Sequence, residues 1–128
     1  MCGIFGIYTK KNNLNFIKKK SELAIKYLSH RGKDDHDNWY SKNFGFAHTR
    51  LSILDLSSKA KQPMICGDDR YVICYNGEIV NFLKLKKNLE KKGVSFKTNS
   101  DTEVILELLK KEKFSMFKYL EGMFVFSI

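Results

Sequence analysis

The sequence has a single proline, three cysteines and no apolar run long enough to span a membrane. The opening stretch GIFGIY has no basic residues before it and is shorter than the apolar segment of a secretory signal peptide. We therefore expect no membrane association and no secretion. These absences predict a cytoplasmic protein.

The cysteines are also wrongly spaced for a metal site. They stand at positions 2, 66 and 74, an odd number in a chain without secretory features, which favours reduced thiols over a disulfide framework. No C-x-x-C pair is present, and the three histidines do not complete a zinc-ligand spacing. We predict no metal and no cofactor in this chain.

Basic residues outnumber acidic ones by 23 to 14, which gives a net charge of +9 and raises the alternative of a nucleic-acid partner. Most lysines fall in stretches with helical spacing, opposite leucines, where they would form a solvated face. No signature of an RNA-binding or DNA-binding motif accompanies them. The sequence therefore favours a lysine-rich surface over a nucleic-acid interface.

With 128 residues, 43% of them hydrophobic and 13% aromatic, the chain can build one domain with a real core. The apolar periodicity predicts strands and helices in mixed order without strict βαβ alternation, which indicates an α+β fold. The expected strands are 3–9, 44–48, 50–54, 70–79, 94–98 and 123–128, the expected helices are 14–28, 79–89 and 104–109, and the expected loops are 30–38 and the segment around 62–67.

Local signals mark the ends of helices and one turn. Gly93 follows the second expected helix as a C-terminal stop, and SDTE at 100–103 has the S-x-x-E form of a capping box before the third. Asn76-Gly77, inside the longest expected strand, is by itself a strong hairpin-turn signal. The sequence contains no repeats, no low-complexity tract and no domain linker.

The cysteine directly behind the initiator methionine is the first candidate for chemistry. Methionine is usually removed when the next residue is small, so Cys2 would then carry a thiol and a free α-amine on one carbon. The thiol needs a base because its free pKa is about 8.5, and an α-amine with a pKa of about 7.7–8.0 is partly neutral at physiological pH. From position alone, a buried apolar cysteine is the simpler interpretation.

Two charged residues could bind the two ends of an amino acid. Arg50 begins the apolar stretch RLSIL, where it could form a surface salt bridge or bind a carboxylate through two parallel hydrogen bonds. Asp101 lies inside the capping box, where it could complement the helix dipole or hold a substrate ammonium group.

Asn76 and Gly77 can form an oxyanion hole instead of a turn. A side-chain amide next to a glycine N–H supplies two donors close together, as the oxyanion of a tetrahedral intermediate requires. Together with Cys2, Arg50 and Asp101, they predict attack by a thiol on the side-chain carbonyl of an α-amino acid. Glutamine is the candidate that fits this set of groups.

The order of the motifs carries a family resemblance. The chain contains, in sequence, MCGIFGIY, HRGKDDHDNW, FAHTRLSILDL, KQPM, YNGEIVN, SDTEVIL and LEGMFVFSI. In this order they resemble the glutaminase domain of glutamine-hydrolysing asparagine synthetase, over nearly the whole chain. Two positions depart from the family pattern: Lys33 replaces a proline and Val80 replaces a tyrosine, and neither has a chemical role in the family.

The resemblance implies roles for individual residues. Cys2 matches the nucleophile, and Asn76 and Gly77 match the oxyanion hole. Arg50 matches the arginine that binds the substrate carboxylate, and Asp101 matches the residue that holds the α-amino group. The positions that match the whole substrate-binding set are Arg50, Leu51, Ser52, Ile53, Leu54, Asn76, Gly77, Glu78 and Asp101.

The resemblance also implies a fold and a wider context. The fold is the four-layer αββα sandwich of N-terminal nucleophile hydrolases, incomplete at its C-terminal side, so that 1–128 would be a partial class II glutamine amidotransferase domain. The family's synthetase domain, which uses aspartate, ATP and Mg²⁺, is absent from this sequence, and a homodimer is the expected assembly of the full-length enzyme. We expect the released ammonia to serve asparagine synthesis, and the isolated chain to fold poorly because its last strand would leave an open edge.

Two alternatives stay open. A related class II amidotransferase would pass ammonia to a sugar or to another acceptor. A non-catalytic basic binding module could keep the same fold. The full set of Cys2, Arg50, Asn76, Gly77 and Asp101 argues against the binding module, which has no use for it.

Overall fold

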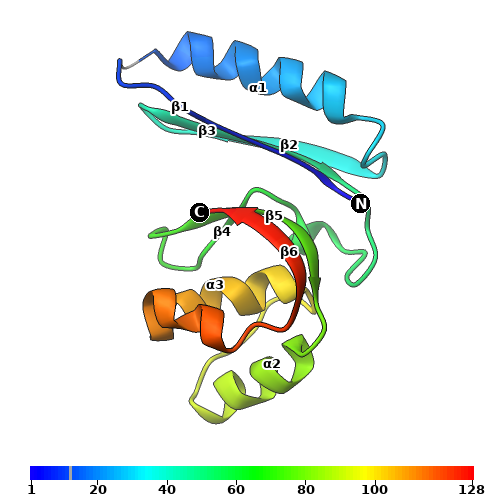
Figure 1. The fold of residues 1–128 in the computed structure, drawn as a ribbon, viewed down its shortest axis with the longest axis vertical. Coiled ribbons are helices and arrows are strands. Elements are labelled where there is room, and N and C mark those ends of the chain that lie inside the picture. Colours follow the sequence, from blue (N-terminus) through cyan, green and yellow to red (C-terminus); the bar gives the residue numbers. More distant parts are fainter. Residues whose placement is uncertain (12) are drawn as a thin grey trace.

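In the computed structural model, the described residues, 1–11 and 13–128, form two three-stranded antiparallel sheets with helices on their outer sides (Figure 1). The strand order is β1-β3-β2 in the first sheet and β4-β5-β6 in the second. The expected α+β class is therefore confirmed. The elements are β1 (Gly3–Tyr8), α1 (Leu14–Leu28), β2 (Asp35–Tyr40), β3 (Phe44–Arg50), the 3₁₀ helix η1 (Ser58–Ala60), β4 (Met64–Ile65), β5 (Val72–Ile79), α2 (Phe82–Lys91), α3 (Asp101–Glu112), the 3₁₀ helix η2 (Lys113–Lys118) and β6 (Gly122–Ser127).

Strand β3 is the centre of the first sheet and is buried on both faces. Successive side chains of a strand point to opposite faces. The hydroxyl of Thr49 donates to the carbonyl of Leu28, the last residue of α1, at 3.0 Å, so this face of β3 lies under α1. Phe46 belongs to a small cluster with Val72 and Cys74 of β5. The first sheet therefore packs on α1 with one face and on the second sheet with the other.

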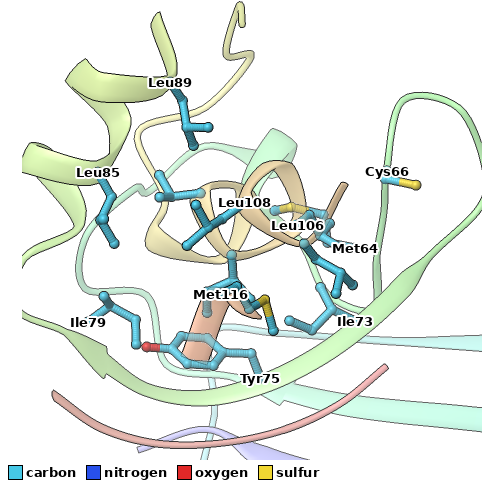
Figure 2. Packing of buried hydrophobic residues seen from close by; sticks show 13 residues of the cluster. Met64, Cys66, Ile73, Tyr75, Ile79, Leu85, Leu89, Leu106, Leu108 and Met116 are labelled. Carbon is cyan, nitrogen blue, oxygen red and sulfur yellow. The ribbon is translucent and has the colours of Figure 1, made fainter. Parts of the chain in front are cut away.

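Strand β5 has the same position in the second sheet. Ile73, Tyr75 and Ile79 share one face and join the main hydrophobic core, against side chains of α2 and α3. Figure 2 shows this packing, with Leu85 and Leu106 among the helix residues around β5. Each buried aliphatic side chain of this kind contributes about 1.5–3 kcal/mol to folding. The core fixes the second sheet on α3, whose first turn carries a predicted site residue.

Several sequence predictions are confirmed by these elements. The predicted helix 14–28 is α1, whose buried residues recur at helical spacing and whose N-cap Asn13 accepts a hydrogen bond from the Phe16 N–H at 3.0 Å. The expected strands at both ends of the chain are β1 and β6. Gly93 follows α2 with φ at +83°, in the left-handed region that favours glycine. Among the described helices, none combines the length and apolarity that crossing a bilayer requires.

Two predictions in the first half of the chain are wrong. The expected loop 30–38 contains the first four residues of β2, whose side chains are exposed or half-buried because β2 is an edge of the first sheet. Backbone pairing with β3 forms this strand, so it shows no apolar alternation. Of the expected strand 50–54, only Arg50 lies in a strand, as the last residue of β3. Ile53 is 74% exposed. The apolar residues of this segment belong to a loop.

The Asn76-Gly77 turn signal is also wrong. Both residues lie within β5 and pair with Val125 and Phe124 of β6. A Cβ atom on Gly77 would lie 2.5 Å from the carbonyl oxygen of Met123, so glycine allows β6 to approach this closely. The strand continues to Ile79, and the helix that was expected from 79 begins at Phe82.

The expected strand 94–98 is an irregular segment held by the start of α3. The Glu103 carboxylate accepts hydrogen bonds from the N–H groups of Lys97 and Thr98, at 2.9 and 2.7 Å. Ser100 caps the helix as predicted, through a 3.1 Å bond from the Thr102 N–H to its hydroxyl. Only the serine half of the capping box is formed, because the Glu103 side chain binds the preceding segment instead of the Ser100 N–H. The helix α3 begins at Asp101 rather than at the expected position 104.

His48 connects the two sheets. It is fully buried, and its Nε2 donates to the Tyr75 carbonyl oxygen at 3.2 Å, which leaves Nδ1 without a hydrogen-bond partner among the described residues. Burial lowers the pKa of His48 from 6.5 to about 4, and the positive charge of Arg50 adds to this effect, while the Tyr75 carbonyl opposes it. The imidazole is therefore neutral in the folded protein near neutral pH.

This burial predicts an acid-sensitive fold. Between pH 6.5 and about 4, the unfolded chain binds a proton at His48 that the folded chain excludes, so stability falls as the pH falls through this window. The loss reaches about 3 kcal/mol at the lower end. His48→Gln keeps an N–H donor without a titrating group, and we expect its urea-unfolding midpoint to depend less on pH in this window.

His36→Gln is the matched control, because it makes the same substitution at an exposed histidine of β2 and leaves His48 in place. Equal slopes of stability against pH in the unmodified protein and in His48→Gln would contradict the assignment.

Candidate active site

A cavity of about 380 Å³ opens between the ends of β1, β3 and β5 and the first turn of α3. Its lining includes the thiol-bearing residue Cys2 and two residues of opposite charge, Arg50 and Asp101. These residues are far apart in sequence, and the fold brings them to one site.

Cys2 precedes β1 and lies beside the residue that follows β3. Its Sγ is 3.4 Å from the Leu51 N–H, which donates to it, and 3.7 Å from the Leu51 carbonyl oxygen. The side chain is half-buried, and Met1 before it is 73% exposed. Cys2 and Met1 both line the cavity, so removal of Met1 would leave the α-amine of Cys2 in the cavity wall.

The segment HRGKD holds the backbone around Cys2 in place. Arg31 donates from Nε to the Cys2 carbonyl oxygen at 3.1 Å. Gly32 lies against β3 so closely that a Cβ atom would be 2.4 Å from the Thr49 carbonyl oxygen. Asp34 accepts at Oδ2 from the Ser52 N–H at 2.7 Å. Sequence reasoning assigned these residues no role, although the motif itself was part of the resemblance.

Arg50 is the last residue of β3 and is 7% exposed. It donates from one terminal nitrogen to the Ser57 carbonyl oxygen at 2.9 Å and from the other to the Asp55 carbonyl oxygen. Within the described residues, its guanidinium forms no ion pair with a carboxylate. The surface salt bridge that the sequence allowed is therefore absent from this part of the chain, and a buried positive charge lines the cavity.

Asp101 is the first residue of α3 and is 4% exposed. Its Oδ2 accepts from the Tyr75 hydroxyl at 2.7 Å and from the Ile79 N–H at 3.2 Å. Burial raises the pKa of Asp101, while the hydrogen bonds from Tyr75, from Ile79 and from the start of the helix oppose that rise. These donors and the helix N-terminus favour the carboxylate form.

The backbone of β5 directs the Gly77 N–H toward the cavity. The Tyr75 N–H donates to Gln62 Oε1 at 2.6 Å and the Ile79 N–H donates to Asp101, so both point away from β6. Backbone N–H groups alternate sides along a strand, and β5 pairs with β6 in unbroken register from Cys74 to Ile79. The N–H of Gly77 therefore points to the same side as those of Tyr75 and Ile79. Asn76 next to it also lines the cavity.

The structure brings most of the predicted site residues together and leaves one out. Ser52 is the exception, because its N–H binds Asp34 and it does not line the cavity. The predicted residues that line the cavity are Cys2, Arg50, Leu51, Ile53, Leu54, Asn76, Gly77, Glu78 and Asp101. Sequence reasoning missed other lining residues, among them Gln62, Tyr75 and Met123. All three lie in motifs of the resemblance: Gln62 in KQPM, Tyr75 in YNGEIVN and Met123 in LEGMFVFSI.

A second, larger cavity of about 640 Å³ lies between the β4–β5 loop and α3 and contains none of the predicted site residues. Four of its charged side chains form two salt bridges: Arg70 pairs with Asp68 at 2.6 Å, and Lys110 pairs with Glu107 at 2.9 Å. Across the part of the chain that the structure describes, no group of three or more His, Cys, Asp or Glu side chains could hold a metal ion. The smaller cavity is the one that combines the Cys2 thiol with unpaired opposite charges.

Comparison with known proteins identifies the family of the chain. The family model described as "Glutamine amidotransferase domain" matches residues 1–128. The chain is 36% identical over 134 residues to asparagine synthetase [glutamine-hydrolyzing] 1 of Bacillus subtilis, and 40% identical over 146 residues to the putative asparagine synthetase [glutamine-hydrolyzing] 2 of Methanocaldococcus jannaschii. It is 35% identical over 128 residues to asparagine synthetase B [glutamine-hydrolyzing] of Escherichia coli.

These three matches cover 100% of this chain but only 20%, 27% and 23% of the respective relatives. The chain thus spans about a quarter of the length of the curated relatives that it matches. Because the family model covers every residue, the chain belongs to the glutamine amidotransferase domain family.

Proposed function

We propose that the cavity binds glutamine and hydrolyses its side-chain amide through a thioester on Cys2. The observation that carries this proposal is that two buried side chains of opposite charge line the same cavity as a thiol. Arg50 and Asp101 are complementary to the carboxylate and the ammonium of one α-amino acid. The amide of a bound glutamine would then extend toward Cys2, since the three groups share one cavity.

In the first step, the neutral α-amine of Cys2, freed by removal of Met1, takes the proton of the thiol. The sulfur forms a bond to the amide carbon, and the carbonyl electron pair moves onto the oxygen. The Gly77 N–H and the Asn76 amide donate to this oxyanion. The tetrahedral centre collapses, the C–N bond breaks, and the α-ammonium returns its proton to the leaving nitrogen, so that ammonia departs.

In the second step, the α-amine accepts a proton from water, and the hydroxide oxygen adds to the thioester carbon. The same donors stabilise the second oxyanion. Collapse breaks the C–S bond, the sulfur recovers its proton, and glutamate leaves. Two protein groups therefore perform both half-reactions, the thiol as nucleophile and the amine as general base and acid.

The fold that we propose for the complete domain is the four-layer αββα sandwich of N-terminal nucleophile hydrolases, of which 1–128 would form a part. The arrangement in Figure 1 supports it, because α1 lies outside the first sheet, while α2 and α3 lie outside the second. Buried contacts between β3 and β5 hold the sheets face to face. In this fold, a nucleophile at the start of β1 lies at the end of the sheet, where the cavity opens.

The ammonia, we further propose, serves asparagine synthesis from aspartate in the whole protein. The names of the three relatives support this destination, since each contains the words asparagine synthetase and glutamine-hydrolyzing, one of them as putative. Aspartate and ATP with Mg²⁺ would bind outside residues 1–128. A sugar or another ammonia acceptor is the alternative, and assays of the intact protein with each acceptor decide between them.

The first test concerns the dual role of Cys2. Cys2→Ala should abolish glutamate release from glutamine in the intact protein. An uncleaved N-terminal extension should do the same although the thiol is intact, because an amide nitrogen has no basic lone pair. Glutamate release is measured by coupled assay, and alkylation of Cys2 by a glutamine-like diazoketone is measured by mass spectrometry.

The same tag placed at the C-terminus controls for the presence of a tag. Cys66→Ala controls for loss of a thiol, because Cys66 lies in the other cavity, and both proteins should keep their activity. Full activity with a blocked Cys2 amine would show that the amine is not the base.

The second test concerns the two charges. Each charge-assisted hydrogen bond is worth about 1.5–3 kcal/mol, so Asp101→Asn and Arg50→Lys should each lower kcat/KM for glutamine about ten- to a hundredfold. Lysine keeps the charge of Arg50 but not its planar fork. Asparagine keeps the shape of Asp101 and an oxygen that accepts from Tyr75.

Lys61→Arg is a conservative control, because Lys61 pairs with Asp35 at the surface and does not line the cavity. Unchanged kcat/KM in both site variants would refute the assignment of the two charges.

A further inference from the structure

The N–H, the carbonyl and the hydroxyl of Tyr75 each form a hydrogen bond within the protein. Its N–H donates to Gln62 Oε1 at 2.6 Å, and its carbonyl oxygen accepts from His48 Nε2 at 3.2 Å. Its hydroxyl donates to Asp101 Oδ2 at 2.7 Å. The side chain is 3% exposed and belongs to the main hydrophobic core, where Figure 2 shows its hydroxyl directed toward Ile79. A group anchored in this way has one orientation.

The rigid hydroxyl in turn orients the carboxylate of Asp101. Both the Tyr75 hydroxyl and the Ile79 N–H bind Oδ2, so these two donors occupy one oxygen and leave Oδ1 to other partners. Asp101 also lines the cavity. The two donors come from the same strand, four residues apart, and together they fix the orientation of the carboxylate relative to β5.

We propose that Tyr75 is a positioning residue that holds the Asp101 carboxylate in the orientation that accepts the α-ammonium group of the substrate, and that it thereby sets the selectivity of the site for amino acids with a free amine. The proposal rests on the proposed glutamine site and adds to it a residue that acts through Asp101.

The chemistry of the phenol fits this role. Burial, followed by its bond to Asp101, raises the pKa of Tyr75 well above its usual range, so the hydroxyl remains a donor. A phenol that donates to a carboxylate favours the ionised form of that carboxylate without adding a positive charge that would repel the ammonium. A lysine or arginine in this place would neutralise Asp101 and compete with the substrate.

The experiment compares two substrates that differ only in the amine. Glutaramate is glutamine without its α-amino group, so it cannot use Asp101, while its amide meets the same thiol. In the intact protein, Tyr75→Phe should lower the ratio of kcat/KM for glutamine to kcat/KM for glutaramate about tenfold, chiefly through a higher KM for glutamine. A purely structural role would change both substrates in parallel and leave the ratio unchanged.

Two further variants make the result specific. Tyr27→Phe removes a phenol that is 71% exposed on α1 and should keep the ratio of the unmodified protein. In the Asp101→Asn background, Tyr75→Phe should change the ratio no further, because its effect passes through the charge of Asp101. An unchanged ratio in Tyr75→Phe, or an equal drop in both backgrounds, would overturn the proposal.

Failure of the glutaminase proposal has a different signature. In that case the unmodified protein would release no glutamate, and the diazoketone would leave Cys2 unlabelled, which would overturn both proposals. If Cys2 is labelled and glutamine is hydrolysed, the ratio for Tyr75→Phe tests the positioning role alone. Unfolding curves for each variant show whether a lowered rate comes from loss of folded protein.

Discussion

The geometry of the cavity depends on the buried guanidinium of Arg50. A buried positive charge needs hydrogen-bond acceptors, and Arg50 finds two of them in the carbonyl groups of Asp55 and Ser57. These bonds fold the apolar segment after β3 back upon the strand end. The same segment supplies the Leu51 N–H to the sulfur of Cys2, and Asp55 binds the Asn99 N–H just before α3 at 2.8 Å. One side chain therefore couples the nucleophile to the helix that carries the second charge.

The second constraint is that β3 and β5 are largely buried on both faces. A strand between a helix and another sheet has no solvent side, so its side chains cannot alternate between apolar and polar. The polar groups that it does carry must find partners inside the protein. His48 and Tyr75 bond to each other in this way across the two sheets, and Thr49 bonds to the end of α1. The hydrogen bonds of these buried polar groups therefore fix the relative position of the two sheets, in addition to the apolar packing between them.

The two buried charges of the site would be costly in an ordinary core. Arg50 and Asp101 are 7% and 4% exposed, and neither is neutralised by a charged side chain among the described ion pairs. Neutral dipoles hold them: backbone carbonyls bind the guanidinium, while a phenol and an N–H bind the carboxylate. Dipoles stabilise a charge without cancelling it, so both charges remain able to attract a zwitterionic ligand.

Local periodicity was enough to predict the α+β class, α1 and the strands at both ends of the chain, and the order of short motifs was enough to propose the candidate residues of the site. Local periodicity misjudged β2, which backbone pairing forms at a sheet edge, and it misjudged the apolar segment 51–54, which follows the end of β3 as a loop beside the cavity. The Asn76-Gly77 dipeptide is compatible with a turn or with a strand. Pairing with β6, which is distant in sequence, makes it part of β5. The hydrogen bond between Tyr75 and Asp101 could be found only in the folded chain, because it joins residues 26 positions apart and no local sequence pattern reports such a contact.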